Sequence, residues 1–205
     1  VALTTFSDLV EEARELIRRD AIEAGFPDDG KSLTDGGVGA MAYSEAVGVY
    51  LALAVSKLAD RSSMICTWAL LRQHPINTFS RQALPMTWDF AEGNPIGNAS
   101  GNFLGGISSI SFGLISCNPS IWGYSIQANA ANQEISQGKL IATDPPYYDN
   151  ICYADLSDFF YIWLRHSLRD VFPNLFSTIS VPKEEELIAS SYLHANKEKA
   201  EIFFL

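Results

Sequence analysis

The most informative stretch of the chain reads Lys139-Leu140-Ile141-Ala142-Thr143-Asp144-Pro145-Pro146-Tyr147. Its first five residues predict a short β-strand over 139–143, and the two prolines, which lack a backbone N–H, end it. A second strand is predicted over residues 122–128. In an open α/β sheet, ligands bind beyond the carboxyl ends of the strands. We therefore expect Asp144 to lie at a ligand site.

Helical patterns dominate the rest of the chain, because apolar residues recur there at intervals of three and four. The segment 43–60 is apolar on nearly every side, which is typical of a buried helix. A short strand or extended link is expected over 62–68. Helices are expected over residues 5–24, 43–60, 77–92 with an interruption near Pro85, 155–169, 182–190 and 195–205.

This order of elements predicts an α/β fold with a substantial helical part. Residues 1–92 form the mainly helical part. The segment 93–119 is rich in Gly, Asn and Ser, which indicates an irregular loop region. Residues 120–205 form the α/β segment that carries the motif at Asp144.

Composition and charge limit the classes of protein to which the chain can belong. The chain has 205 residues, 47% of them hydrophobic, which is enough for a sizeable core. The net charge of -10 argues against non-specific binding of nucleic acid by this chain alone, because Lys and Arg supply most of that affinity. Three separated cysteines suggest neither a disulfide framework nor a zinc site and favour a cytoplasmic location.

The longest apolar stretch, residues 46–55, is too short to span a bilayer, so no membrane association is expected. The chain begins with Val-Ala-Leu instead of Met and closes on the apolar run 201–205. We expect it to be an internal piece of a longer polypeptide, whose other parts are its partner. No spacing predicts the oligomeric state.

The Asp-Pro-Pro-Tyr motif has a chemical rationale. By chance it would arise in a chain of this length on the order of once in a thousand, so we treat it as a signal. An exocyclic amine on a heteroaromatic ring is a poor nucleophile, and two acceptors aimed at its hydrogens encourage attack on a methyl group. The Asp144 carboxylate and the Pro145 carbonyl are the candidates, Pro146 adds rigidity, and Tyr147 offers a stacking face. The alternative is a rigid turn with Tyr147 packed in the core.

The residues after the motif resemble those of a known family. These are Tyr148-Asp149-Asn150-Ile151, then Tyr153-Ala154-Asp155-Leu156-Ser157-Asp158-Phe159-Phe160-Tyr161 and Trp163-Leu164-Arg165. Two earlier segments, 39–52 and 77–92, are also similar. The family is that of the large bacterial and archaeal adenine-specific DNA methylase-like proteins.

The resemblance implies a partial Rossmann-like methyltransferase domain, S-adenosylmethionine as cofactor, and DNA as a partner bound through the full-length protein. It implies a catalytic role for the motif residues Asp144 to Tyr147. Tyr148, Asp149 and Asn150 are then candidate contacts to the substrate. Asn129 and Asp144 are weaker candidate contacts to the cofactor, and no metal is expected.

Two departures from the family pattern bear on activity. Asn129 stands where the family usually has an acidic residue near the cofactor adenine. The upstream Gly-rich cofactor loop, Asp-Pro-Phe-x-Gly-Gly-Gly, is absent from the 205 residues. We therefore expect the chain alone to transfer no methyl group.

Other functions fit the same pattern. As alternatives to adenine in DNA, the same two acceptors suit an amine of RNA, of cytosine or of a protein amide. A non-catalytic scaffold in a restriction or defence assembly would also keep the motif. His74, His166 and His194 have no ligand spacing. Glu184, Glu185 and Glu186 open the helix expected over 182–190, where negative charge is favourable.

Overall fold

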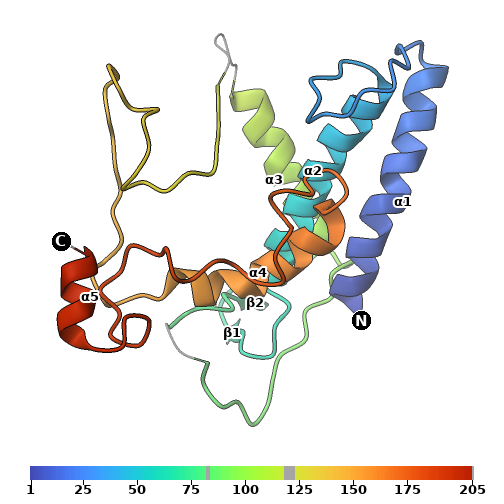
Figure 1. The fold of residues 1–205 in the computed structure, drawn as a ribbon. Helices are drawn as coiled ribbons and strands as arrows, with labels where there is room; N and C mark the ends of the chain where they lie inside the picture. The colour runs from blue at the N-terminus through green and yellow to red at the C-terminus, as the bar shows by residue number, and fades with distance from the viewer. Residues whose placement is uncertain (82–83, 118–122, 205) are drawn as a thin grey trace. The chain divides into compact units, whose positions relative to one another are not determined.

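The computed structural model of the chain describes residues 1–81, 84–117 and 123–204. The chain divides into two compact units. Unit 1 comprises Val1–Ser116 and Asp158–Ser180, and unit 2 comprises Cys117–Ser157 and Val181–Leu205. Figure 1 shows the helices, most of which belong to unit 1.

Two long helices start unit 1. Helix α1 spans Ala2–Glu23 and helix α2 spans Ala40–Ala59, close to the predicted bounds. They pack against each other (Figure 1). The loop between them is held by side chains, because the Glu45 carboxylate accepts the Leu33 N–H at 2.6 Å and the Asp29 carboxylate accepts the N–H groups of Lys31 and Val38.

The core of unit 1 lies between α1, α2 and the segment after residue 164. The buried apolar side chains that form it are Val10, Ala52, Val55, Leu168, Val171 and Phe176. Half of the residues of α2 are buried, in line with the prediction for this segment, but Tyr43 is 46% exposed and Leu53 is 42% exposed. Small residues line much of its buried face, which allows close packing of neighbouring helices.

Helix α3 spans Phe103–Ser116, where irregular structure was expected. Its glycines pointed to a loop, but tertiary packing outweighs that propensity. Gly106 is the buried residue of α3 and faces α2, where a Cβ in its place would make an ordinary van der Waals contact at 3.7 Å with the Ala54 carbonyl oxygen.

The described residues contain one sheet of two strands. Strand β1, Thr67–Ala69, pairs antiparallel with β2, His74–Ile76. The strand or link predicted over 62–68 thus contributes only its last residues to β1. Residues 139–143, where one strand was expected, are irregular. Residues 123–128 of the strand expected over 122–128 are irregular too, and Trp122 lies outside the described residues. A strand needs a neighbour to pair its backbone groups, and neither segment has one within the described chain.

Two other expected helices are not formed. Over 77–92, the described residues are irregular. The Thr78 N–H and hydroxyl both bond to the Asp60 carbonyl, at 2.8 Å each, and Pro85 cannot donate in a helix. Over 182–190 the chain is irregular too, because the Ala189 N–H bonds to the Tyr148 carbonyl instead of a helical partner.

Helix α4 spans Tyr153–Leu168 and helix α5 spans Lys197–Phe204, which confirms the helices predicted over 155–169 and near the chain end. Within the described residues, none of the helices combines the length and apolar character that crossing a bilayer requires.

Candidate active site around Asp144

The motif lies on a tight turn of unit 2 that leads into α4. The Tyr148 N–H bonds to the Pro146 carbonyl at 3.0 Å, and the Asn150 N–H bonds to the Tyr147 carbonyl at 2.9 Å. Tyr148 has a φ of 48°, a left-handed conformation that is uncommon for a non-glycine residue. The prolines carry no backbone N–H to donate, so Pro146 takes part in the turn through its carbonyl, which accepts the Tyr148 N–H.

Tyr148 anchors this turn to other parts of unit 2. Its hydroxyl donates to a Glu201 carboxylate oxygen at 3.3 Å, and its ring meets Phe204 edge-on at 5.1 Å. Its carbonyl accepts the Ala189 N–H at 2.9 Å. Desolvation, followed by the Glu201 carboxylate, raises the pKa of Tyr148 above its ordinary value. The positive φ is therefore maintained by contacts on three sides of the residue.

Tyr147 has the opposite environment. Its side chain is 63% exposed, so the alternative in which it packs in the core is wrong. The turn directs two successive tyrosines differently, one into contacts within unit 2 and one to solvent. Tyr147 therefore presents an exposed aromatic ring within the motif.

The four motif residues share one cavity. It has a volume of about 560 Å³ and is lined by Asp144, Pro145, Pro146, Tyr147, Ile151, Tyr153 and Glu186. Asp144 and Pro145 are exposed. Within the described part of the chain, neither the Asp144 carboxylate nor the Pro145 carbonyl has a hydrogen-bond partner. Both acceptors are thus available to a ligand.

Glu186 joins this cavity from a distant part of the sequence. Its Oε1 accepts the Ala154 N–H at 3.0 Å, at the N-terminus of α4. The prediction that Glu186 begins a helix of its own is wrong, because its carboxylate instead accepts an N–H of the first turn of α4. Tyr153 and Ile151 were also missed as lining residues. No sequence pattern predicts the approach of Glu186, because the contact joins segments 32 residues apart.

Cys152 precedes α4 and is half-buried. Burial raises the pKa of its thiol, and the carboxylates of Asp155 and Glu186 raise it further. A helix N-terminus often lowers a thiol pKa, but here desolvation and two negative charges outweigh that effect. The thiol is therefore protonated at neutral pH and is not an activated nucleophile.

The remaining predicted residues lie elsewhere. Asp149 and Asn150 are exposed on the turn and do not line the cavity. Asn129 lies in a separate turn of unit 2, where its side-chain oxygen accepts the Ala131 N–H at 2.9 Å. Among the described residues, no three His, Cys, Asp or Glu side chains gather as a metal site would require.

Of the two candidate contacts to S-adenosylmethionine, Asp144 lines this cavity and Asn129 does not. Asn129, the expected partner of the cofactor adenine, uses its amide oxygen within its own turn and is not part of the cavity. The sequence contains no Gly-rich segment of the kind that cradles this cofactor. What the cavity offers is two free acceptors and an exposed aromatic ring, a set that suits a flat amine.

Comparisons with known proteins identify no relative. No protein-family model, no curated protein and no solved structure matches the chain.

Proposed function

We propose that this chain is the target-amine half of an S-adenosylmethionine-dependent methyltransferase, acting on the exocyclic amino group of adenine in DNA. One observation carries the proposal. The Asp144 carboxylate and the Pro145 carbonyl, both without partners in the described chain, line one cavity with the exposed ring of Tyr147.

The pocket has one chemical task, which is to make the amine nitrogen more nucleophilic. The lone pair of an adenine amine is delocalised into the ring, so the nitrogen has to become tetrahedral before it attacks a methyl group. Hydrogen bonds from the two amine hydrogens to Asp144 and Pro145 favour that geometry and stabilise the positive charge that develops on nitrogen. The ring of Pro145 restricts its own φ, so the acceptor carbonyl is held in position.

Base binding has its own requirements. Tyr147 supplies an aromatic face on which an extruded base can stack. A volume of about 560 Å³ lies within the range of roughly 300–1,000 Å³ typical of small-molecule sites. Glu186 is engaged with the Ala154 N–H, so we assign it to positioning α4 beside the pocket.

A protein amide is the second candidate target. The net charge of -10 favours this alternative, because an acidic chain attracts basic proteins and repels phosphates. A side-chain amide also presents a flat, conjugated nitrogen to the same two acceptors. The two candidates differ in their product and can be separated by analysing it.

The test uses the protein expressed from its complete coding sequence. DNA from cells with and without it is digested to nucleosides, and methyladenine is measured by mass spectrometry. We expect methyladenine to depend on the protein and Asp144→Ala to lower methylation by roughly 100-fold or more, since removing one preorganised partner of a transition state has about this effect. Asp170→Ala is the matched control, because Asp170 is exposed and lies in unit 1.

Three results would contradict the proposal. Equal methyladenine with and without the protein removes DNA adenine as the target. Methylated glutamine or asparagine in proteins, lost in Asp144→Ala, supports the second candidate. A cellular phenotype that Asp144→Ala leaves unchanged, with the variant folded, indicates a scaffold.

A further inference from the structure

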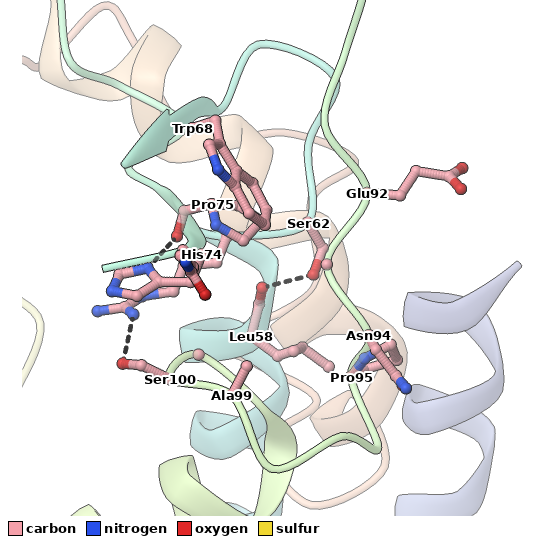
Figure 2. A pocket seen from close by; sticks show the side chains of 14 residues that line it. Leu58, Ser62, Trp68, His74, Pro75, Glu92, Asn94, Pro95, Ala99 and Ser100 are labelled. Atoms are coloured by element: carbon pink, nitrogen blue, oxygen red, sulfur yellow. Dashed lines mark hydrogen bonds between the residues drawn. The ribbon is translucent and has the colours of Figure 1, made fainter. Parts of the chain in front are cut away.

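Two adjoining cavities lie at the C-terminal end of α2, within unit 1. One, of about 250 Å³, is lined by Trp68, His74 and the segment 92–95 (Figure 2). The other, of about 320 Å³, is lined by Lys57 and by residues at the start of α3. Arg61 lines both. None of the motif residues belongs to them.

Arg61 is a cation without an anion. It is half-buried, and its side-chain hydrogen bond is to the neutral Ser100 hydroxyl at 3.3 Å. Neither Arg61 nor Lys57 forms an ion pair within the described residues. This is notable because the chain carries 24 acidic and 14 basic side chains. A partly desolvated guanidinium without a counterion is costly unless a ligand neutralises it.

Nearby carboxylates do not fill this role. Asp60, the neighbour of Arg61 in sequence, accepts the Thr78 N–H at 3.2 Å. Glu92 borders the first cavity, but its carboxylate points away from Trp68 and His74 (Figure 2). The second cavity has no acidic lining residue among those described. The second cavity, lined by Arg61 and Lys57, is therefore locally positive in an acidic chain.

The loop beside Arg61 is built to pass close to the guanidinium. Gly101 has a φ of +94°, and a Cβ built there would lie 2.7 Å from the Arg61 Cδ. The backbone conformation favours glycine here, and a larger residue would also have to displace the Arg61 side chain. The arrangement holds the Arg61 side chain between α2 and the loop instead of leaving it free in solvent.

Trp68 adds an aromatic face to the same cavity. It lies on β1 opposite Pro75 of β2, and its side chain is 45% exposed. Figure 2 shows its indole beside Pro75, with Ser100 across the pocket. An indole and a guanidinium in one cavity, with a lysine in the next, match the parts of a nucleotide, since bases stack on aromatic rings and phosphates pair with cations.

We propose that these two cavities bind a nucleoside phosphate, with the base stacked on Trp68 and the phosphate held by Arg61 and Lys57. Single-stranded nucleic acid and free nucleotides both carry this chemistry. The inference extends the proposed function, because it gives unit 1 a contact with nucleic acid. Its test measures binding and not methylation, so the two proposals can fail separately.

The test measures binding of a fluorescein-labelled single-stranded oligothymidylate to the 205-residue chain by fluorescence anisotropy at several salt concentrations. Trp68→Ala is expected to weaken binding by roughly 5- to 100-fold, the usual effect of losing one stacked base. Arg61→Gln and Lys57→Gln should each lower the slope of log affinity against log salt by about 0.7, the value for one phosphate on a single strand. Lys57 is exposed, so its variant remains informative if Arg61→Gln destabilises the fold.

Matched controls separate this site from general charge effects. Trp88 is 92% exposed and lines neither cavity, and Arg19 is an exposed cation of α1. We expect Trp88→Ala and Arg19→Gln to bind as the unmodified chain does. Absence of binding by the unmodified chain, or equal losses in site and control variants, overturns the proposal.

Competition identifies the source of the nucleotide. If thymidine monophosphate displaces the labelled strand at equal nucleotide concentration, the site takes free nucleotides. If only unlabelled strands displace it, the ligand is single-stranded nucleic acid. Displacement by inorganic phosphate at the same concentration refutes a role for the base and overturns the proposal.

Discussion

Val55→Ala tests which face of α2 is buried. The Val55 side chain is 0% exposed and belongs to the core of unit 1. Alanine deletes two methyl groups, each contributing about 0.8 kcal/mol of transfer free energy. The space left behind adds a cavity term of about 1 kcal/mol, because a packed core relaxes only in part. We expect the free energy of unfolding to fall by about 2–3 kcal/mol.

The assay is thermal unfolding of the 205-residue chain followed by far-ultraviolet circular dichroism. A loss of this size lowers the Tm of a unit with these dimensions by roughly 5–10 °C. Leu53→Ala is the matched control, since Leu53 lies on the same helix and is 42% exposed. It removes more atoms but should cost less than about 1 kcal/mol. If Leu53→Ala destabilises the chain as much as Val55→Ala, α2 buries a different face and the reasoning is refuted.

Two further predictions concern charge. Glu186→Gln removes a negative charge beside Cys152, so the pKa of the Cys152 thiol should fall. We expect iodoacetamide to label Cys152 faster at constant pH, as measured by mass spectrometry. Glu185→Gln, which changes an exposed neighbour, should leave the labelling rate unchanged. Backbone N–H groups lower the pKa of Asp29 below its ordinary value, so its carboxylate stabilises the loop at and above pH about 4, and this contribution is lost as the pH falls through the lowered pKa. We expect the Val38 amide proton, which bonds to that carboxylate, to titrate below pH about 4 in NMR spectra, and Asp29→Asn to abolish the titration. An unchanged Val38 titration in Asp29→Asn contradicts the assignment.

Much of the helical structure was predictable from local patterns. Helices α1 and α4 follow from apolar residues spaced at three and four, since each helix forms its hydrogen bonds within its own segment. Helix α3 was not predictable in this way. Its glycines favour a loop, and the helix packs against α2, a contact that local sequence patterns do not specify.

The expected strands show the limit of the same approach. The residues over 139–143 have strand-like composition, yet their backbone is irregular because the described chain provides no pairing partner. A strand depends on a neighbour that can come from anywhere in a sequence, which a local pattern cannot specify. The α/β methyltransferase fold therefore stays a prediction.

At the candidate site, the sequence by itself determined which chemical groups are adjacent, because acceptor, proline and aromatic residues follow one another from Asp144 to Tyr147. Tertiary structure alone decided that Tyr148 contacts Glu201 and Phe204, and it brought Glu186 to the first turn of α4. Both depend on contacts between segments distant in sequence. The loop at Gly101 follows the same rule, since its close approach to the Arg61 side chain joins residues 40 positions apart in the sequence. The residue type determines which interactions a side chain can form, and tertiary packing determines which partners lie within its reach.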